Sequence, residues 1–252
     1  MRRDKNNTSW QNSATWYNKI TGDKGHYYHE HVVIPETLKL LNLKPGDKIL
    51  DLACGNGVLG RQIPRGVEYT GVDIADALIR TAKKMDTNLS HEYVTGDVTR
   101  NLSIDKKFTH ATIILALQNI RLPEKAIENV SRYLSTNGIL VIVLNHPSFR
   151  IPRQSSWEID GAKKTQFRRI DKYMSQMSIP INTNPSDRNS AVTWSYHFPI
   201  SDYSHMLKDA GLLIESIEEW TSDKESEGRS AKMENRSRSE FPLFMAIVAR
   251  KI

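Results

Sequence analysis

The stretch that decides the fold of this 252-residue chain runs from Ile49 to Gly57 and reads ILDLACGNG. A short apolar run, Lys48–Ala53, leads directly into its glycines, and Val58–Ile63 then has the spacing of a short helix. The pattern predicts a strand, a glycine turn and a helix. Glycines at such a turn let a ligand approach the backbone where a Cβ atom would collide with it. In an open parallel sheet, ligands bind at the carboxyl ends of the strands, which this turn would line.

Strands and helices continue to alternate after this turn. Further strands are expected at Val67–Val72, Tyr93–Val94, Ala111–Leu117 and Ile139–Leu144, and helices at Ala75–Lys84 and Leu122–Leu134. The fourth and fifth of the strands are apolar on both faces, which suits a parallel sheet covered by helices on both sides. The sequence therefore predicts an α/β fold.

The flanks of this core belong to the same predicted domain. Residues 1–33 are polar and aromatic without a clear period, and we interpret them as an amino-terminal cap. Residues 34–144 form the ligand-binding core, which opens with a helix through about Leu41 because Pro35 suits a first helical turn. Residues 145–200 are an insert, longer than an ordinary connection, that we interpret as a lid over a substrate.

The last part of the chain, residues 201–252, is expected to complete the sheet. It predicts a helix at Ser201–Ala210 and strands at Leu212–Ile217 and Phe241–Ala249. Between the two strands lies a charged run, Ser222–Glu240, which has the character of a solvated helix or a mobile flap.

Composition limits the classes of protein that remain. The formal net charge is +6, which favours acidic partners such as phosphorylated metabolites, nucleic acids or carboxylates without choosing among them. Cys54 is the one cysteine, so an intramolecular disulfide and a multi-cysteine metal site are excluded. No segment has the apolar length of a membrane span or a signal peptide, and we therefore expect no membrane partner and a cytoplasmic location.

Two carboxylates follow the predicted strands at positions that suit a nucleoside. Asp73 ends the second strand 18 residues after Gly55, where it can accept hydrogen bonds from ribose hydroxyls. Asp97 follows the third strand, where an exocyclic amine could donate to it. Because Gly55, Gly57 and Gly60 also satisfy a dinucleotide fingerprint, an NAD(P)- or flavin-binding oxidoreductase is an alternative. Asp51, within a strand that dinucleotide sites usually keep apolar, weighs against that alternative, as does Asp97.

At these residues the chain resembles the class I S-adenosylmethionine-dependent methyltransferases, over roughly Ile49–Leu144 and more weakly at the carboxyl end. The resemblance implies a Rossmann-like, seven-stranded, mostly parallel sheet whose last strand is antiparallel, and S-adenosylmethionine as cofactor. It implies that Asp51, Gly55 and Gly57 surround the methionine part. It also implies the remaining cofactor contacts, which are Ala53, Asp73 at the ribose, Ile74 on the adenine, Asp97 and Val98 at the adenine edge, and Leu115.

The resemblance further places Leu117, Gln118 and Asn119 opposite the transferable methyl group, so Gln118 and Asn119 are candidate substrate residues. The methyl group on a sulfonium is already electrophilic, and the protein mainly has to align a nucleophile and exclude water. Where the nucleophile is a hydroxyl or an amine, a general base helps, and histidine is the usual one. His146, after the fifth strand, is the predicted base; anchoring the turn before Pro147 is its alternative role.

Three histidines in the cap, His26, His29 and His31, have a spacing that a metal site could use. They lack a partnering carboxylate pattern, and we predict no metal. Tyr27, Tyr28 and His29 are instead expected to close over the site, and Tyr28 and His29 are candidate substrate residues, with core packing the alternative for at least one tyrosine.

The insert supplies further candidate substrate residues, Arg150, Tyr196 and His197. Arg150 belongs to an expected positive rim with Arg153, Arg168 and Arg169, since guanidinium groups bind carboxylates and phosphates in a fork. Solvation of these arginines, or pairing with nearby acids, is the alternative.

The sequence therefore predicts methyl transfer to an O or N nucleophile of a small metabolite, acidic or aromatic in character. Methylation of RNA or protein is the alternative, and a cofactor-binding regulator without turnover is a third possibility. The oligomeric state cannot be inferred from the sequence.

Overall fold

A computed structural model describes residues 10–184 and 190–252. Its core is a seven-stranded sheet with the order β10-β11-β5-β4-β1-β2-β3. The strands β5, β4, β1, β2 and β3 run parallel, and β11 is antiparallel to both β5 and β10. The strands, in chain order, are β1 (Lys48–Leu52), β2 (Glu68–Asp73), β3 (His91–Thr95), β4 (Phe108–Ile114), β5 (Leu134–Asn145), β10 (Leu212–Trp220) and β11 (Phe244–Lys251). The predicted fold class, including the antiparallel last strand, is confirmed.

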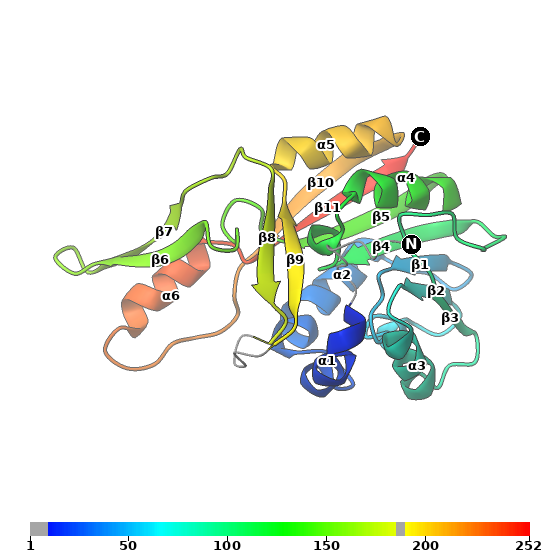
Figure 1. Ribbon diagram of the computed structural model, residues 1–252, viewed down its shortest axis with the longest axis horizontal. Helices are drawn as coiled ribbons and strands as arrows, with labels where there is room; N and C mark the ends of the chain where they lie inside the picture. Colours follow the sequence, from blue (N-terminus) through cyan, green and yellow to red (C-terminus); the bar gives the residue numbers. More distant parts are fainter. Residues whose placement is uncertain (1–9, 185–189) are drawn as a thin grey trace.

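Helices cover both faces of this sheet (Figure 1). Helices α4 (Pro123–Tyr133) and α5 (Ile200–Asp209) bury apolar side chains such as Ile127 and Leu207 against one face. Helices α2 (Ile34–Leu41) and α3 (Asp76–Met85) bury theirs, among them Leu41 and Ile79, against the other. The central strands are buried from both sides, which accounts for their continuous apolar sequence.

Two turns differ from the expected elements. Val58–Ile63 contains a single 3-10 turn, η3 (Gly60–Gln62), in place of the predicted helix, because Gly57 has a φ of +76° and Pro64 follows within one turn. The fourth strand ends at Ile114, and Leu117 begins another 3-10 turn, η4 (Leu117–Asn119). The chain therefore turns away from the sheet at Leu115, which has a φ of +51°.

The insert folds into two separate hairpins. Hairpin β6 (Ser155–Asp160) and β7 (Thr165–Ile170) projects from the core beside α6 (Ala231–Glu240), as Figure 1 shows at the left. Hairpin β8 (Met177–Asn182) and β9 (Val192–His197) instead packs β9 against η4 at the carboxyl edge of the sheet. Part of the charged run Ser222–Glu240 forms the predicted helix, which is α6. The Ser237 hydroxyl of α6 donates to the Gln166 carbonyl in the projecting hairpin at 3.0 Å.

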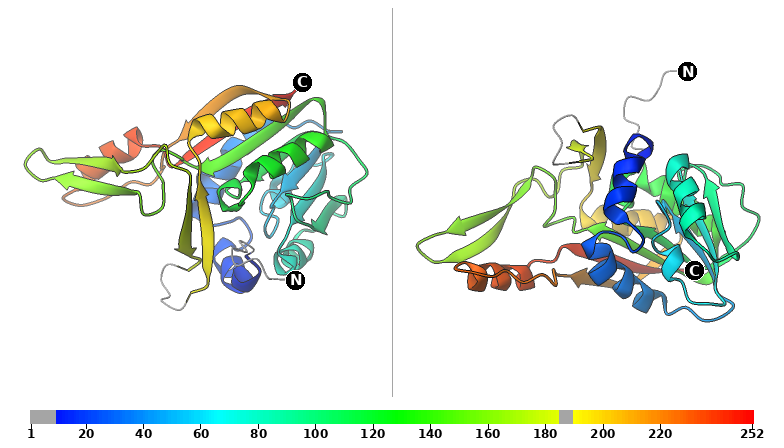
Figure 2. Two further views of the ribbon diagram at one scale, coloured as in Figure 1. Left: turned by 45° about the horizontal axis from the view of Figure 1, so that its top comes forward. Right: turned by 90° about the horizontal axis from the view of Figure 1, so that it is seen from below.

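The amino-terminal cap is helical where it is described; its residues 1–9 lie outside the described part. It comprises the 3-10 turn η1 (Trp10–Ser13), α1 (Ala14–Thr21) and a π-helical turn η2 (His29–Val33) that leads straight into α2. Figure 2 shows α1 beside α3, at the edge of the sheet. The Ser13 hydroxyl donates to Thr183 Oγ1 at 2.9 Å, so the cap meets the end of hairpin β8–β9. In the described part of the chain, no helix has the length and apolar character needed to cross a membrane.

Candidate active site

The cap and the carboxyl ends of β1 and β4 enclose a crevice. Residues from four parts of the chain line it, namely Tyr17, His29, Ile34, Asp51, Ala53, Cys54, Val58, Leu59 and Ile114. Of the predicted cofactor residues, Asp51 and Ala53 are in this lining, as is the predicted substrate residue His29. The sheet topology brings Asp51, Ala53 and Ile114 together, because neighbouring parallel strands end at the same edge, and the docked cap adds Tyr17 and His29.

Two residues at this edge hold a left-handed backbone that side chains other than glycine rarely adopt. Ala53 has a φ of +57° after β1, and Leu115 a φ of +51° after β4. The Gln118 amide donates to the Leu115 carbonyl at 2.8 Å and holds that turn. Because such conformations cost free energy and collect at ligand sites, they support the positions predicted for Ala53, Leu115 and Gln118.

The Asp51 carboxylate is buried on the floor of the crevice. Its two oxygens accept hydrogen bonds from the Tyr69 hydroxyl at 2.7 Å and the Thr112 hydroxyl at 2.8 Å. Burial raises the pKa of Asp51 to about 6, although those two hydrogen bonds act in the opposite direction. An ionised Asp51 is therefore costly unless a positive charge comes near it.

Asp73 fixes the glycine turn. One oxygen accepts from the Gly55 N–H at 2.9 Å, and the other accepts from the Ala75 N–H at 2.8 Å. Burial raises the pKa of Asp73, and the two backbone hydrogen bonds oppose that rise. Each carboxylate oxygen can accept more than one hydrogen bond, so Asp73 retains capacity for the predicted ribose contact.

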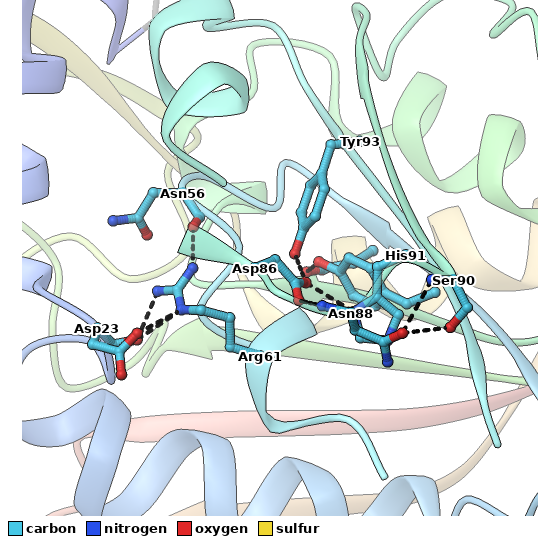
Figure 3. A network of polar contacts seen from close by, with 10 residues as sticks. Asp23, Asn56, Arg61, Asp86, Asn88, Ser90, His91 and Tyr93 are labelled. Atoms are coloured by element: carbon cyan, nitrogen blue, oxygen red, sulfur yellow. Dashed lines mark hydrogen bonds and ion pairs between the residues drawn. The ribbon is translucent and has the colours of Figure 1, made fainter. Parts of the chain in front are cut away.

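The glycines of the turn have close neighbours within the protein. A Cβ atom on Gly55 would lie 3.5 Å from the Tyr17 hydroxyl oxygen, and one on Gly57 would lie 2.7 Å from that of Tyr93. Tyr93 in turn donates to Asp86 at 2.6 Å, and the same carboxylate oxygen contacts His91 Nδ1 at 2.8 Å (Figure 3). A side chain at position 57 would therefore collide with Tyr93, which a buried hydrogen-bond network holds in place, so this position requires glycine.

A second set of contacts ties the cap to the same turn (Figure 3). Arg61 donates to the Asn56 carbonyl at 2.5 Å and to the Asp23 carbonyl at 2.6 Å. The buried Asn56 amide donates to Thr21 Oγ1 at 2.8 Å and to Asn18 Oδ1 at 3.2 Å. The position of the cap is thereby coupled to the position of the glycine turn.

The predicted adenine contacts lie at the neighbouring strand ends. Ile74 is 48% exposed, and such an apolar side chain at the ligand edge suits packing against a flat ring. Val98 is buried. Asp97 accepts from the Thr99 N–H at 3.0 Å and pairs with Arg100 at 3.2 Å, so an adenine amine would share this carboxylate with local partners.

His146 makes contacts that favour its alternative, anchoring role. Its Nε2 lies 2.6 Å from Glu219 Oε1, and its Nδ1 accepts from the Ser148 N–H at 3.1 Å. Since Nδ1 is an acceptor, Nε2 carries the proton and donates to Glu219. Burial lowers the pKa of His146, and Glu219 acts in the opposite direction. Both nitrogens are engaged within the protein, and the base role stays a prediction that no contact supports.

The cap histidines point to different partners. The His26 and His29 rings lie 4.0 Å apart, whereas His31 stacks on Tyr27 at 4.3 Å. Burial, with the charge of His26, lowers the pKa of His29 to about 3. Across the residues that the structure describes, no group of three His, Cys, Asp or Glu side chains could hold a metal ion.

Of the predicted substrate residues of the insert, Tyr196 and His197 lie on strand β9, whereas Arg150 lies beside Phe244. His197 Nε2 lies 2.6 Å from the Tyr173 carbonyl, an internal contact of the insert, and burial lowers its pKa. Tyr196 is buried on the same strand, β9. Arg150 instead lies over the Phe244 ring, with its guanidinium carbon 5.6 Å from the ring centroid. Tyr28 packs edge-on against that ring at 5.6 Å.

Sequence reasoning missed Tyr17 and the polar side chains around Asn56. Tyr17 is half-buried over Gly55, and desolvation of its hydroxyl raises the pKa of that group. The sequence carried one signal, an aromatic pair at Trp16 and Tyr17 in an otherwise polar cap. Without a partner segment in the pattern, nothing in the sequence connected that pair to the glycine turn.

A family model described as a methyltransferase domain matches residues 43–174, which is more than half of the chain. The chain therefore belongs to this family of methyltransferase domains, and its fold is that of solved class I S-adenosylmethionine-dependent methyltransferases. The assignment decides against the NAD(P)- or flavin-binding alternative.

Two curated relatives share about 30% identity with the chain, in each case over 42% of its length. The chain is 30% identical over 109 residues to a demethylmenaquinone methyltransferase of Paenarthrobacter aurescens, a match that spans 42% of each chain. It is 29% identical over 117 residues to a ubiquinone/menaquinone biosynthesis C-methyltransferase of Hydrogenovibrio crunogenus, over 42% of this chain and 45% of the relative. The chain thus spans less than half the length of these curated relatives.

Among solved structures, an S-adenosylmethionine-dependent methyltransferase of Mesorhizobium loti has a TM-score of 0.69 at 23% identity, covering 86% of this chain and 96% of that one. This likeness concerns the fold.

The site residues fit S-adenosylmethionine. Asp51 supplies a buried carboxylate that a sulfonium or ammonium charge would stabilise. The buried Nδ1 of His29 has no hydrogen-bond partner among the described residues, so it is available to a ligand in the crevice. Ile74 offers the exposed apolar surface that an adenine ring requires.

Proposed function

We propose that this protein transfers the methyl group of S-adenosylmethionine to a small-molecule acceptor. The observation that carries the proposal is the cover that the cap forms over the crevice. Tyr17 and His29 of the cap line it directly, and the contact between Ser13 and Thr183 joins the cap to hairpin β8–β9. A site that a cap partly covers suits a small acceptor better than a large one.

The chain's own residues would mainly orient the reactants and exclude water. When bound, S-adenosylmethionine supplies an electrophilic methyl group. Asp51 would balance positive charge in the crevice, and Asp73 would hold both the glycine turn and the ribose. Gln118, which fixes the turn at Leu115, would border the acceptor. Catalysis of this kind depends on alignment more than on a base, which agrees with the internal contacts of His146.

The acceptor atom is part of the proposal. The sequence favours an O or N nucleophile, whereas one curated relative is a C-methyltransferase by name. Incubation with methyl-labelled S-adenosylmethionine and a metabolite extract, followed by mass spectrometry of labelled products, tests both the acceptor class and the atom. Label in small molecules is the expected result. Label found only in RNA or protein would contradict it.

Methylation of RNA or protein remains a second candidate because of one feature. Hairpin β6–β7 projects from the core (Figure 1). It exposes Trp157, Ile159 and Phe167, and it also carries basic side chains such as Arg169. Aromatic and basic side chains together are typical of nucleic-acid contacts. The dependence of KM on salt concentration separates the two candidates.

A further inference from the structure

Of the four arginines that the sequence places in a positive rim, two make polar contacts within the protein and one is exposed to solvent. Arg169 pairs with Asp171 at 2.8 Å and with Glu158 at 3.2 Å. Arg168 donates to the Phe149 carbonyl at 2.7 Å and to the Ser155 hydroxyl at 2.8 Å. Arg153 is exposed to solvent. These three contribute little that is available to a ligand in the crevice.

Arg150 differs from all three. Its guanidinium is half-buried against the Phe244 ring, and it makes no ion pair or side-chain hydrogen bond to any described residue. Burial lowers the pKa of the Arg150 guanidinium, Tyr28 raises it, and the charge of Arg168 lowers it again. A guanidinium carries five N–H donors, and withdrawing them from water without acceptors costs free energy. Such a cost is typical of a group that awaits a ligand.

The position of Arg150 connects it to the crevice. Tyr28 shares the Phe244 ring with it, and the next residue, His29, lines the crevice. On the other side, the Tyr28 hydroxyl contacts the Ser222 hydroxyl at 3.1 Å, and Lys224 Nζ lies 5.1 Å from the centroid of the Tyr28 ring. Arg150 and Lys224 therefore bring positive charge to the aromatic pair Tyr28 and Phe244. The charge of Arg150 also acts on His26, whose ring lies 4.0 Å from that of the crevice residue His29.

We propose that Arg150 binds an anionic group of the acceptor, a carboxylate or a phosphate, so that this enzyme selects acidic small molecules. The inference rests on the proposed function and names its substrate class. A guanidinium fork matches the two oxygens of a carboxylate or phosphate, and the bound anion would supply the acceptors that Arg150 lacks. Phe244 holds the guanidinium plane, and an aromatic acceptor would pack against Tyr28.

A binding experiment tests the charge preference without turnover. Benzoate, phenyl phosphate and the neutral benzamide serve as probes, and saturation-transfer NMR measures their binding to protein saturated with S-adenosylhomocysteine. The two anions are expected to bind more strongly than benzamide. Arg150→Gln should reduce anion binding to the benzamide level, about tenfold or more. Arg150→Lys, which keeps the charge and loses the fork, should retain part of the preference.

Arg169→Gln is the matched control, because it removes a guanidinium that is exposed and already paired, and it should bind the probes as the wild type does. Equal binding of benzoate and benzamide by the wild type would overturn the inference. An anion preference that survives in Arg150→Gln, with S-adenosylhomocysteine affinity unchanged, would overturn it too.

A transfer experiment separates this inference from the proposed function. A metabolite extract is divided by anion exchange into acidic and neutral fractions, and each is incubated with methyl-labelled S-adenosylmethionine. Label is expected in the acidic fraction and should fall about tenfold in Arg150→Gln. Label confined to neutral molecules and unaffected by the substitution would overturn the role of Arg150 and leave the function intact. Label in neither fraction would overturn both.

Discussion

At the scale of single residues, Asp51 is a crevice group whose charge burial disfavours strongly. It is buried, and its pKa of about 6 lies well above the ordinary value of 3.8. A carboxyl with a raised folded-state pKa binds more protons when the protein is folded. Asp51 therefore contributes about 3 kcal/mol to the free energy of unfolding of the ligand-free protein that is lost as the pH rises between about 4 and 6, while buried histidines such as His29, whose pKa is lowered to about 3, contribute in the opposite direction.

Asp51→Asn should remove the contribution of Asp51, so the difference in the free energy of unfolding between variant and wild type should shift in the variant's favour by about 3 kcal/mol between about pH 4 and 6. The variant should be the more stable protein near pH 7, since an amide can still bond the Tyr69 and Thr112 hydroxyls. Chemical unfolding at several pH values measures both effects. Asp105→Asn, at an exposed position, is the control and should leave the pH dependence unchanged. A free-energy difference between variant and wild type that does not change between about pH 4 and 6 would mean that Asp51 does not titrate in this range.

Asp73 should be required for cofactor binding for two reasons. It is the predicted ribose acceptor, and it also holds the Gly55 and Ala75 amides. Asp73→Ala should weaken S-adenosylhomocysteine binding by about 1.5–3 kcal/mol, the usual loss for a charge-assisted hydrogen bond. Isothermal titration calorimetry gives the affinity, and unchanged affinity would mean that Asp73 neither contacts the ribose nor shapes the turn. Asp105→Ala again serves as the control.

His146 should matter more for stability than for chemistry. His146→Ala would leave the Ser148 N–H without its acceptor and Glu219 without its donor, at a cost of about 1–3 kcal/mol. We expect a lower melting temperature, while the pH profile of turnover per folded protein keeps its shape. Glu219→Gln retains a hydrogen-bonding partner for the ring and should be milder. If His146→Ala abolishes turnover without loss of stability, the predicted base role is restored.

At the scale of elements, apolar patterning predicted the sheet well. The sixth strand appears as β10 and is longer than expected, because Glu218–Trp220 continue to pair along β11. The fifth strand appears as β5 and begins earlier than expected, at Leu134, which pairs with Phe108 of β4. The insert was harder to predict. Its first hairpin carried a turn signal at Asp160-Gly161, but its place beside α6 depends on contacts such as Ser237 to Gln166 that no local pattern encodes.

In the candidate site, too, local sequence patterns predicted some residues and could not predict others. Asp51, Ala53 and Asp73 could be predicted because each closes a strand at a known edge. Tyr17 and the cap contacts of Asn56 could not, since they depend on how a helix without strong periodicity docks on the sheet. The same limit applied to Arg150, which the sequence grouped with three arginines that fold into different surroundings.

Hairpin β8–β9 should act as a cover that the cap holds in place. Ser13→Ala removes the hydroxyl contact to Thr183 and should loosen the hairpin without touching the crevice lining. We expect faster amide exchange over Val192–His197 and a several-fold faster release of S-adenosylhomocysteine, roughly the effect of one lost hydrogen bond. Ser239→Ala, which removes a local contact in α6, is the control. Unchanged exchange in both variants would show that the hairpin is held by other contacts.

At the scale of the whole molecule, a net charge of +6 and a projecting basic hairpin raise the question of a nucleic-acid substrate. Counterion release makes nucleic-acid affinity fall steeply with salt, whereas a ligand in an enclosed crevice loses little. If the acceptor is a small molecule, KM should change only a few-fold between about 50 and 200 mM salt, against about a thousandfold for a macromolecule with many phosphate contacts. Arg169→Gln together with Lys163→Gln, on the projecting hairpin, should leave KM unchanged in the first case and lower the salt slope in the second. If KM depends steeply on salt and these substitutions reduce that dependence, the substrate is a macromolecule and the hairpin is the surface that binds it.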